Sequence, residues 1–148
     1  MDEMAVAAIV GAAVVTVVAL VLALRAVAKR REAEADDALI GERILLRDPS
    51  ANLMGVQSAG MGQVRGNGVL SLTEYRLHFL MWLPRREVVI PLSRVTGIET
   101  PEEFMGKSKH RPLLQVNFTG EEGHPDAAAW AVRKLPVWRE RIEQLLER

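Results

Sequence analysis

The stretch GNGVLSLTEYRLHFLMWLPRREVVIPLSRVTGIE, residues 66–99, decides the fold, because three alternating apolar patterns follow one another within it. Alternation with a period of two predicts strands that each bury one face. The linkers between the patterns, TEY and PRR, are short, which favours an antiparallel meander. The residues expected to point inward are Leu70 and Leu72, then Leu77, Phe79, Met81 and Leu83, then Val88, Ile90 and Leu92.

Similar patterns flank this stretch on both sides. GERILLRD, residues 41–48, is expected to form the first strand. Two further strands are predicted downstream, in RPLLQVNF at 111–118 and AAAWAV at 127–132. Their inward residues are Leu114, Val116 and Phe118 in the first, and Ala128, Trp130 and Val132 in the second.

The C-terminal segment changes to a helical pattern after Pro136, a residue that is common in the first turn of a helix. One face of the helix is apolar, formed by Trp138, Ile142, Leu145 and Leu146, with Leu135 as a hydrophobic staple before it. Such a helix would cover the open end of a curved sheet, so Trp138 is predicted to lie in the core.

This order of elements resembles the pleckstrin-homology-like (PH-like) fold. Residues 66–99 are similar to the GRAM and bacterial PH-like branch, in which a small-G-x-L-x-L-T strand precedes a strand ending in aromatic residues and then IPLSRV. The resemblance covers about residues 42–147 and extends to uncharacterised bacterial proteins with an RGNGVL core. It implies an α+β, mainly β domain at 41–148: a curved antiparallel sheet or partly open barrel capped by the helix. Members usually bind lipids or proteins and are not enzymes.

Residues 4–24, MAVAAIVGAAVVTVVALVLAL, are predicted to form one transmembrane helix, because the run has no charge and a helix of this length spans about 31 Å. A cleaved signal peptide is the alternative, since AVA at 26–28 resembles a processing site. The acidic residues before the run, its length and Arg25 all disfavour cleavage, so we expect a retained anchor.

The charges beside the anchor predict its orientation. Four cations follow the apolar run, whereas Asp2 and Glu3 precede it, so the N-terminus is expected outside the cell membrane and the domain in the cytoplasm. The absence of cysteine from the sequence fits that compartment. Residues 25–40 are expected to form a helical linker whose cations contact anionic lipid head groups: Arg25, Lys29, Arg30 and Arg31.

Composition excludes several classes of function. The formal net charge is zero, which gives no sign of nucleic-acid binding. The three histidines are not grouped, and no metalloprotease spacing or nucleophile elbow accompanies them. We therefore expect no metal, no cofactor and no catalytic residue.

Basic residues in predicted loops are candidates for binding a phosphate or an acidic lipid, provided that the fold brings them together. If it does not, they are scattered solubilising charges. The candidates are Arg65, Arg85, Arg86, Lys107, Lys109 and Arg111.

Leu80 and Trp82 are apolar on the face of their strand where alternation predicts polar residues. Such a face is expected to dock a protein partner, a second copy or the membrane, or else to be buried under residues 48–62.

The glycine-rich stretch AGMGQVRGNG, residues 59–68, contains neither a dinucleotide-binding fingerprint nor a P-loop. It is expected to bend the chain, with Asn67-Gly68 as a tight turn into the next strand. The predicted function is a single-pass, membrane-anchored binding module for protein interaction or self-association, without enzymatic activity. The alternative is binding of anionic lipid head groups by the same domain.

Overall fold

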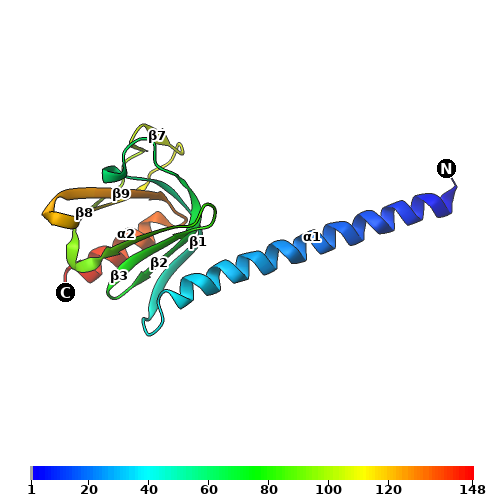
Figure 1. Cartoon of the computed structure of the whole chain (residues 1–148), viewed down its shortest axis with the longest axis horizontal. Helices are drawn as coiled ribbons and strands as arrows, with labels where there is room; N and C mark the ends of the chain where they lie inside the picture. Colours follow the sequence, from blue (N-terminus) through cyan, green and yellow to red (C-terminus); the bar gives the residue numbers. More distant parts are fainter. Residues whose placement is uncertain (1) are drawn as a thin grey trace. The chain divides into compact units, whose positions relative to one another are not determined.

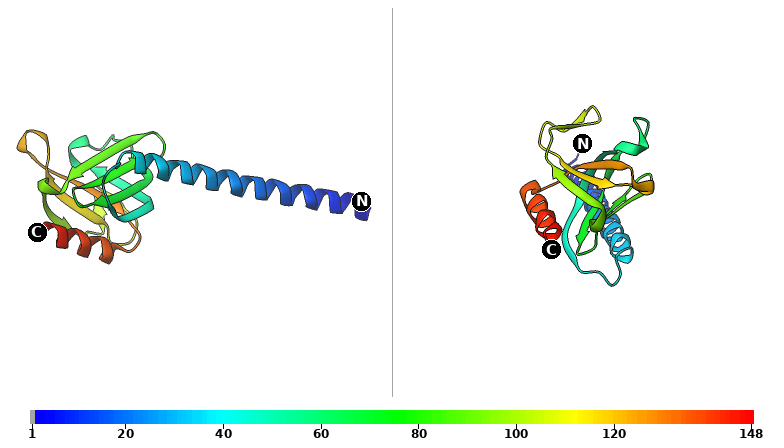
Figure 2. Two further views of the ribbon diagram at one scale, coloured as in Figure 1. Left: turned by 90° about the horizontal axis from the view of Figure 1, so that it is seen from below. Right: turned by 90° about the vertical axis from the view of Figure 1, so that its left-hand side faces the viewer.

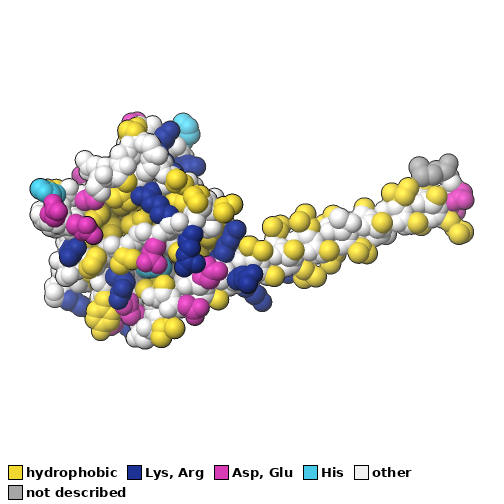
Figure 3. All heavy atoms as spheres, in the orientation of Figure 1, with side chains coloured by type: hydrophobic (Ala, Val, Ile, Leu, Met, Phe, Trp, Pro, Cys, Tyr) yellow, Lys and Arg dark blue, Asp and Glu magenta, His cyan; other side chains and the backbone are white. Residues whose placement is uncertain are grey.

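The computed structural model describes residues 2–148, which form two compact units divided between Glu34 and Ala35 (Figure 1). Helix α1 (Glu3–Asp37) contains the predicted anchor and continues unbroken through most of the predicted helical linker. It is long and apolar enough to cross a membrane, and its most apolar window is fully exposed. Figure 3 shows hydrophobic side chains along the visible face of its apolar part. A signal sequence near the N-terminus would also pass this test of length and composition.

The second unit is an α+β fold with a seven-stranded antiparallel sheet in the order β4-β3-β2-β1-β9-β8-β5. Its strands are β1 (Ile44–Val56), β2 (Gly66–Thr73), β3 (Arg76–Met81), β4 (Arg86–Pro91), β5 (Val95–Glu99), β8 (Leu114–Thr119) and β9 (Pro125–Ala131). The predicted meander is confirmed by the successive antiparallel pairs β1–β2, β2–β3 and β3–β4. The sheet is curved but not closed, because β4 and β5 remain its two edges (Figures 1 and 2).

Three short turns and a hairpin connect the strands. The turns are η1 (Gln57–Ala59), η2 (Leu92–Arg94) and η3 (Glu121–Gly123), and the hairpin consists of β6 (Glu103–Phe104) and β7 (Lys107–Ser108). Helix α2 (Leu135–Leu146) follows β9 and packs against β5, β8 and η2.

The first strand is longer than the sequence predicts. It passes through Pro49, where the pairing with β2 shifts register, as expected of a proline at a bulge. The buried Asp48 carboxylate stabilises this irregularity by accepting hydrogen bonds from the backbone N–H groups of Ser50 at 2.9 Å and Arg133 at 2.7 Å. Residues 48–56 are therefore part of the sheet and not a cover over it.

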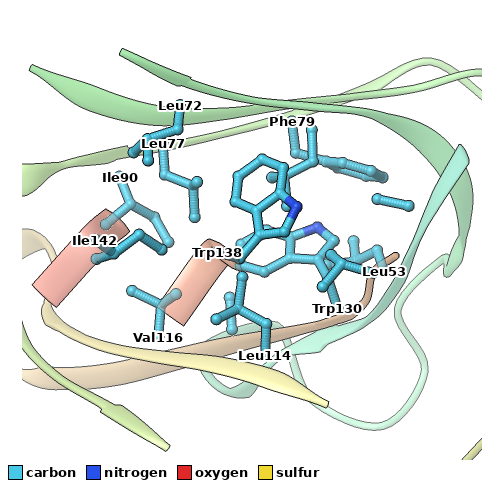
Figure 4. Close-up of a cluster of buried hydrophobic side chains, with 14 of the residues drawn as sticks. Leu53, Leu72, Leu77, Phe79, Ile90, Leu114, Val116, Trp130, Trp138 and Ile142 are labelled. Atoms are coloured by element: carbon cyan, nitrogen blue, oxygen red, sulfur yellow. The ribbon is translucent and has the colours of Figure 1, made fainter. Parts of the chain in front are cut away.

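The predicted core is largely confirmed. Trp130 and Phe79 meet with ring centroids 5.9 Å apart, and Trp138 of α2 is 3% exposed in the same cluster (Figure 4). Leu83 is the exception, at 83% exposed, because β3 ends at Met81 and the alternation does not continue into the turn.

A second, smaller apolar cluster lies on the outer face of β9. Its three outward alanines, Ala127, Ala129 and Ala131, pack with Phe104 and Leu113 from the segment between β5 and β8. Alanine leaves room for this segment to lie against the sheet. The packing places the β6–β7 hairpin over the strands.

The prediction of a tight turn at Asn67-Gly68 is wrong. Both residues lie in β2, and neither has a positive φ. Gly68 is needed for the close approach of β2 to β3, because a Cβ at this position would lie 2.3 Å from the carbonyl oxygen of Leu80. Gly60, with φ of 75°, does provide a bend after η1.

Candidate functional site

The loop between β1 and β2 is held together by two side chains. Gln63 donates to the carbonyl oxygens of Val56 and Gly60 at 2.7 and 2.6 Å. The Arg65 guanidinium donates to those of Met54 at 2.6 Å and Met61 at 3.0 Å. Most of the hydrogen-bonding capacity of Arg65 therefore fixes the loop, a role that the sequence analysis did not foresee.

Arg86, at the start of β4, contacts the same loop. Its Nη1 donates to the carbonyl oxygen of Val64 at 2.6 Å and to Oε1 of Gln63 at 3.1 Å. Burial lowers the pKa of Arg86, and the positive charge of Arg65 lowers it further. The two arginines thus lie close together, and no ion pair is found for either among the described residues.

Both lysines among the predicted basic candidates lie near Arg65. Lys107 and Lys109, from the β6–β7 hairpin, line a hollow of about 330 Å³ with Arg65 and Asn52. Both lysines are exposed. The hollow is positively charged and open to solvent.

The other basic candidates are not brought into this hollow. Arg85 and Arg111 are exposed, and they line neither this hollow nor the larger one described below. Arg25, Lys29, Arg30 and Arg31 all lie on α1.

The predicted apolar docking surface is largely covered by the chain itself. Leu80 is 3% exposed and packs with Val69 and Ala35, and Trp82 lies half-buried against this cluster. Ala35 belongs to the last turns of α1, where Arg47 of β1 forms an ion pair with Asp36 at 2.5 Å. The expected alternative, a cover formed by residues 48–62, is wrong because that segment begins as a strand.

His78 is buried on the outer face of β3, opposite Leu77 and Phe79 as predicted. Its Nε2 lies 3.2 Å from Oε2 of Glu87 on β4. His110 and His124 are exposed in loops. Across residues 2–148, no group of three or more His, Cys, Asp or Glu side chains is arranged to hold a metal ion.

A hollow larger than the basic one is not apparent from the sequence. It is a groove of about 610 Å³ between edge strand β4 and the β8–η3–β9 hairpin, with the end of β1 and η1 also contributing. Apolar residues of the core cluster, Val56, Val88 and Phe118, reach into it. Figure 3 shows a hollow on this face, with hydrophobic side chains in it and acidic ones at its rim. Such a groove could be inferred from the sequence only if the position of β4 relative to the β8–η3–β9 hairpin were known.

Comparison with known proteins shows the fold alone. No family model matches the chain, and no curated protein matches it. A chain of a solved structure entitled "The 8S snRNP Assembly Intermediate" is similar with a TM-score of 0.54 and 9% identity, covering 70% of this chain and 82% of that one. The C-terminal domain of an unknown protein from Leishmania infantum is similar with a TM-score of 0.50 and 16% identity, over 78% and 94% of the two chains.

Proposed function

We propose that the chain is a single-pass protein of the cell membrane, with its N-terminus outside and a non-enzymatic, PH-like binding domain in the cytoplasm. The exposed apolar side chains of α1 and the four cations that follow them support the anchor and its orientation. The meander of β1 to β4 and the helix bearing Trp138 support the PH-like assignment. In this proposal the domain binds a protein partner or a second copy at the membrane.

The observation that carries the binding role is the groove beside β4. Most sheets protect their edges, because an unpaired edge is a template for another strand. Here the edge lies next to a hollow that reaches the apolar core. A domain that leaves this surface uncovered is suited to binding a partner.

A photo-crosslinker introduced into the full-length chain in its native membrane tests this role. Val89, 39% exposed on β4, is the position for Val89→p-benzoylphenylalanine. The control position is Val137, 45% exposed on α2. We expect a discrete adduct from position 89 and none from position 137. Equal labelling at both positions, or none at position 89, would contradict a binding role for the groove.

Binding of anionic head groups is the second candidate function, favoured by the convergence of Lys107 and Lys109 on Arg65. The test compares the full chain in nanodiscs of phosphatidylcholine with and without phosphatidylserine. We expect slower amide exchange in the β6–β7 hairpin in the anionic discs, reversed by salt and lost in K107Q/K109Q. The control is K134Q, which removes a charge elsewhere. Identical exchange in both lipids would rule this function out.

A further inference from the structure

We infer that the groove binds an extended polypeptide segment, which adds to the free edge of β4 as an eighth strand and carries basic side chains toward the rim. This inference rests on the proposed binding role and names the partner's chemistry. It is drawn from three features of the groove: the main-chain edge of β4, the wall that faces it, and the charge of the rim.

The first feature is the unpaired main chain of β4. The strand pairs with β3 along its whole length: Arg86 lies opposite Met81 at one end, and Pro91 lies opposite Arg76 at the other. No strand among the described residues lies on the other side of β4. The N–H and C=O groups on that side therefore have no partner strand, which is the requirement for strand addition. A main-chain edge recognises any extended peptide, whereas a small molecule could match it only locally.

The second feature is the wall that faces β4. The β8–η3–β9 hairpin lines the groove opposite the strand, through residues such as Phe118, Thr119 and Pro125. A second folded copy would have to bring the edge of its own sheet against β4 beside this wall, whereas a single extended segment requires only the space of one strand. The apolar side chains of such a segment would meet Val88 and Phe118.

The third feature is the charge. Four carboxylates line the groove, those of Glu87, Glu121, Glu122 and Asp126. The basic groups there are the guanidinium groups of Arg86 and Arg94 and the imidazole of His124, whose Nε2 lies 4.0 Å from Oε2 of Glu122. Arg86 is bound to the carbonyl oxygen of Val64, and Asp126 is bound to Ser58. Glu121 and Glu122 are exposed on the η3 turn. Complementarity therefore favours lysine or arginine in the incoming strand.

The test measures binding of a fluorescent peptide, Lys-Val-Thr-Val-Lys-Val-Thr, to the full chain in phosphatidylcholine nanodiscs. One control peptide replaces each lysine with glutamate, and another carries N-methyl groups on alternate residues, which removes the hydrogen bonds along one edge. We expect the lysine peptide to bind at least about tenfold more tightly than either control, since each comparison removes favourable contacts. Amide exchange in β4 should slow on binding.

Matched variants locate the charge effect. E121K/E122K should weaken binding of the lysine peptide about 3- to 10-fold. E140K/E147K makes the same charge change on α2 and at its C-cap and should leave binding unaltered. Equal effects of the two variants, or equal binding of the lysine and glutamate peptides, would overturn the basic partner.

Strand addition itself is overturned if the peptide does not bind, if the N-methylated peptide binds equally well, or if exchange in β4 is unchanged. The crosslinking experiment separates this failure from that of the binding role. If position 89 gives an adduct but the peptide does not bind, the binding role stands and strand addition is overturned. If there is neither an adduct nor peptide binding, the binding role and strand addition are both overturned.

Discussion

The Arg86 guanidinium donates a 2.6 Å hydrogen bond to the carbonyl oxygen of Val64, which joins edge strand β4 to the loop between β1 and β2. The same side chain reaches Gln63, whose amide organises that loop. Arg86 thus adds a contact from β4 to the loop that Gln63 and Arg65 hold together.

Replacement of Arg86 by alanine should therefore loosen the loop. Hydrogen bonds made by a charged donor contribute about 1–3 kcal/mol, and we expect R86A to lower the free energy of unfolding by about that amount. Amide exchange in residues 57–65 should become faster. The matched control is R111A, an exposed arginine for which we expect a change below about 0.5 kcal/mol. Unaltered exchange in R86A would show that the loop does not depend on this contact.

Gly68 should tolerate no side chain. A Cβ would lie 2.3 Å from the carbonyl oxygen of Leu80 and 2.7 Å from Cζ of Phe79, so β2 and β3 would have to separate. We expect G68A to destabilise the domain by at least about 1–3 kcal/mol in urea unfolding of the full chain in detergent micelles. In G62A, the control, the added methyl group meets nothing within 4 Å. Similar midpoints for the two variants would contradict the close approach.

Trp138 should be the main attachment of α2. Its side chain is 3% exposed within the core cluster, and removal of a buried tryptophan costs about 3–5 kcal/mol. We expect W138A to lower the thermal unfolding midpoint, followed by circular dichroism, and to speed amide exchange throughout α2. V137A, one residue away and exposed, should behave as the parent chain. If both variants melt together, the helix is not held by its apolar face.

The proposed orientation can be measured by labelling, because the sequence contains no cysteine. We expect a cysteine introduced by D2C to react with an impermeant maleimide in intact cells. One introduced by E140C, on the exposed face of α2, should react only after permeabilisation. The reverse pattern would place the domain outside. Loss of the N-terminal cysteine from the mature protein would instead indicate a cleaved signal sequence.

The strands and their buried faces were predictable, because inward residues such as Leu70, Phe79 and Val116 recur with a period of two. The pattern fails where the chain turns, as at Leu83, and it cannot show that β1 continues past Pro49. Continuation there depends on Asp48, whose partner Arg133 is distant in the sequence.

The candidate site was predictable only in part. Basic loop residues are visible in the sequence, but the convergence of Lys107 on Arg65 depends on how the β6–β7 hairpin packs over the sheet. The groove was not predictable, because it lies between edge strand β4 and the β8–η3–β9 hairpin, which only the folded sheet brings near each other. Burial of Leu80 was one of the two alternatives, but its cover was not predictable, because Ala35 lies in a segment expected to be a linker.

The outward alanines of β9 set the height at which the β6–β7 hairpin, and with it Lys107 and Lys109, stands above the sheet. The volume of these buried side chains therefore affects where the positive charges of the hairpin lie on the surface. Enlarging Ala129 would displace two positive charges without altering the charge of the protein. A substitution at this buried position can thus change the positions of surface charges, an effect that comparison of surface residues alone would overlook.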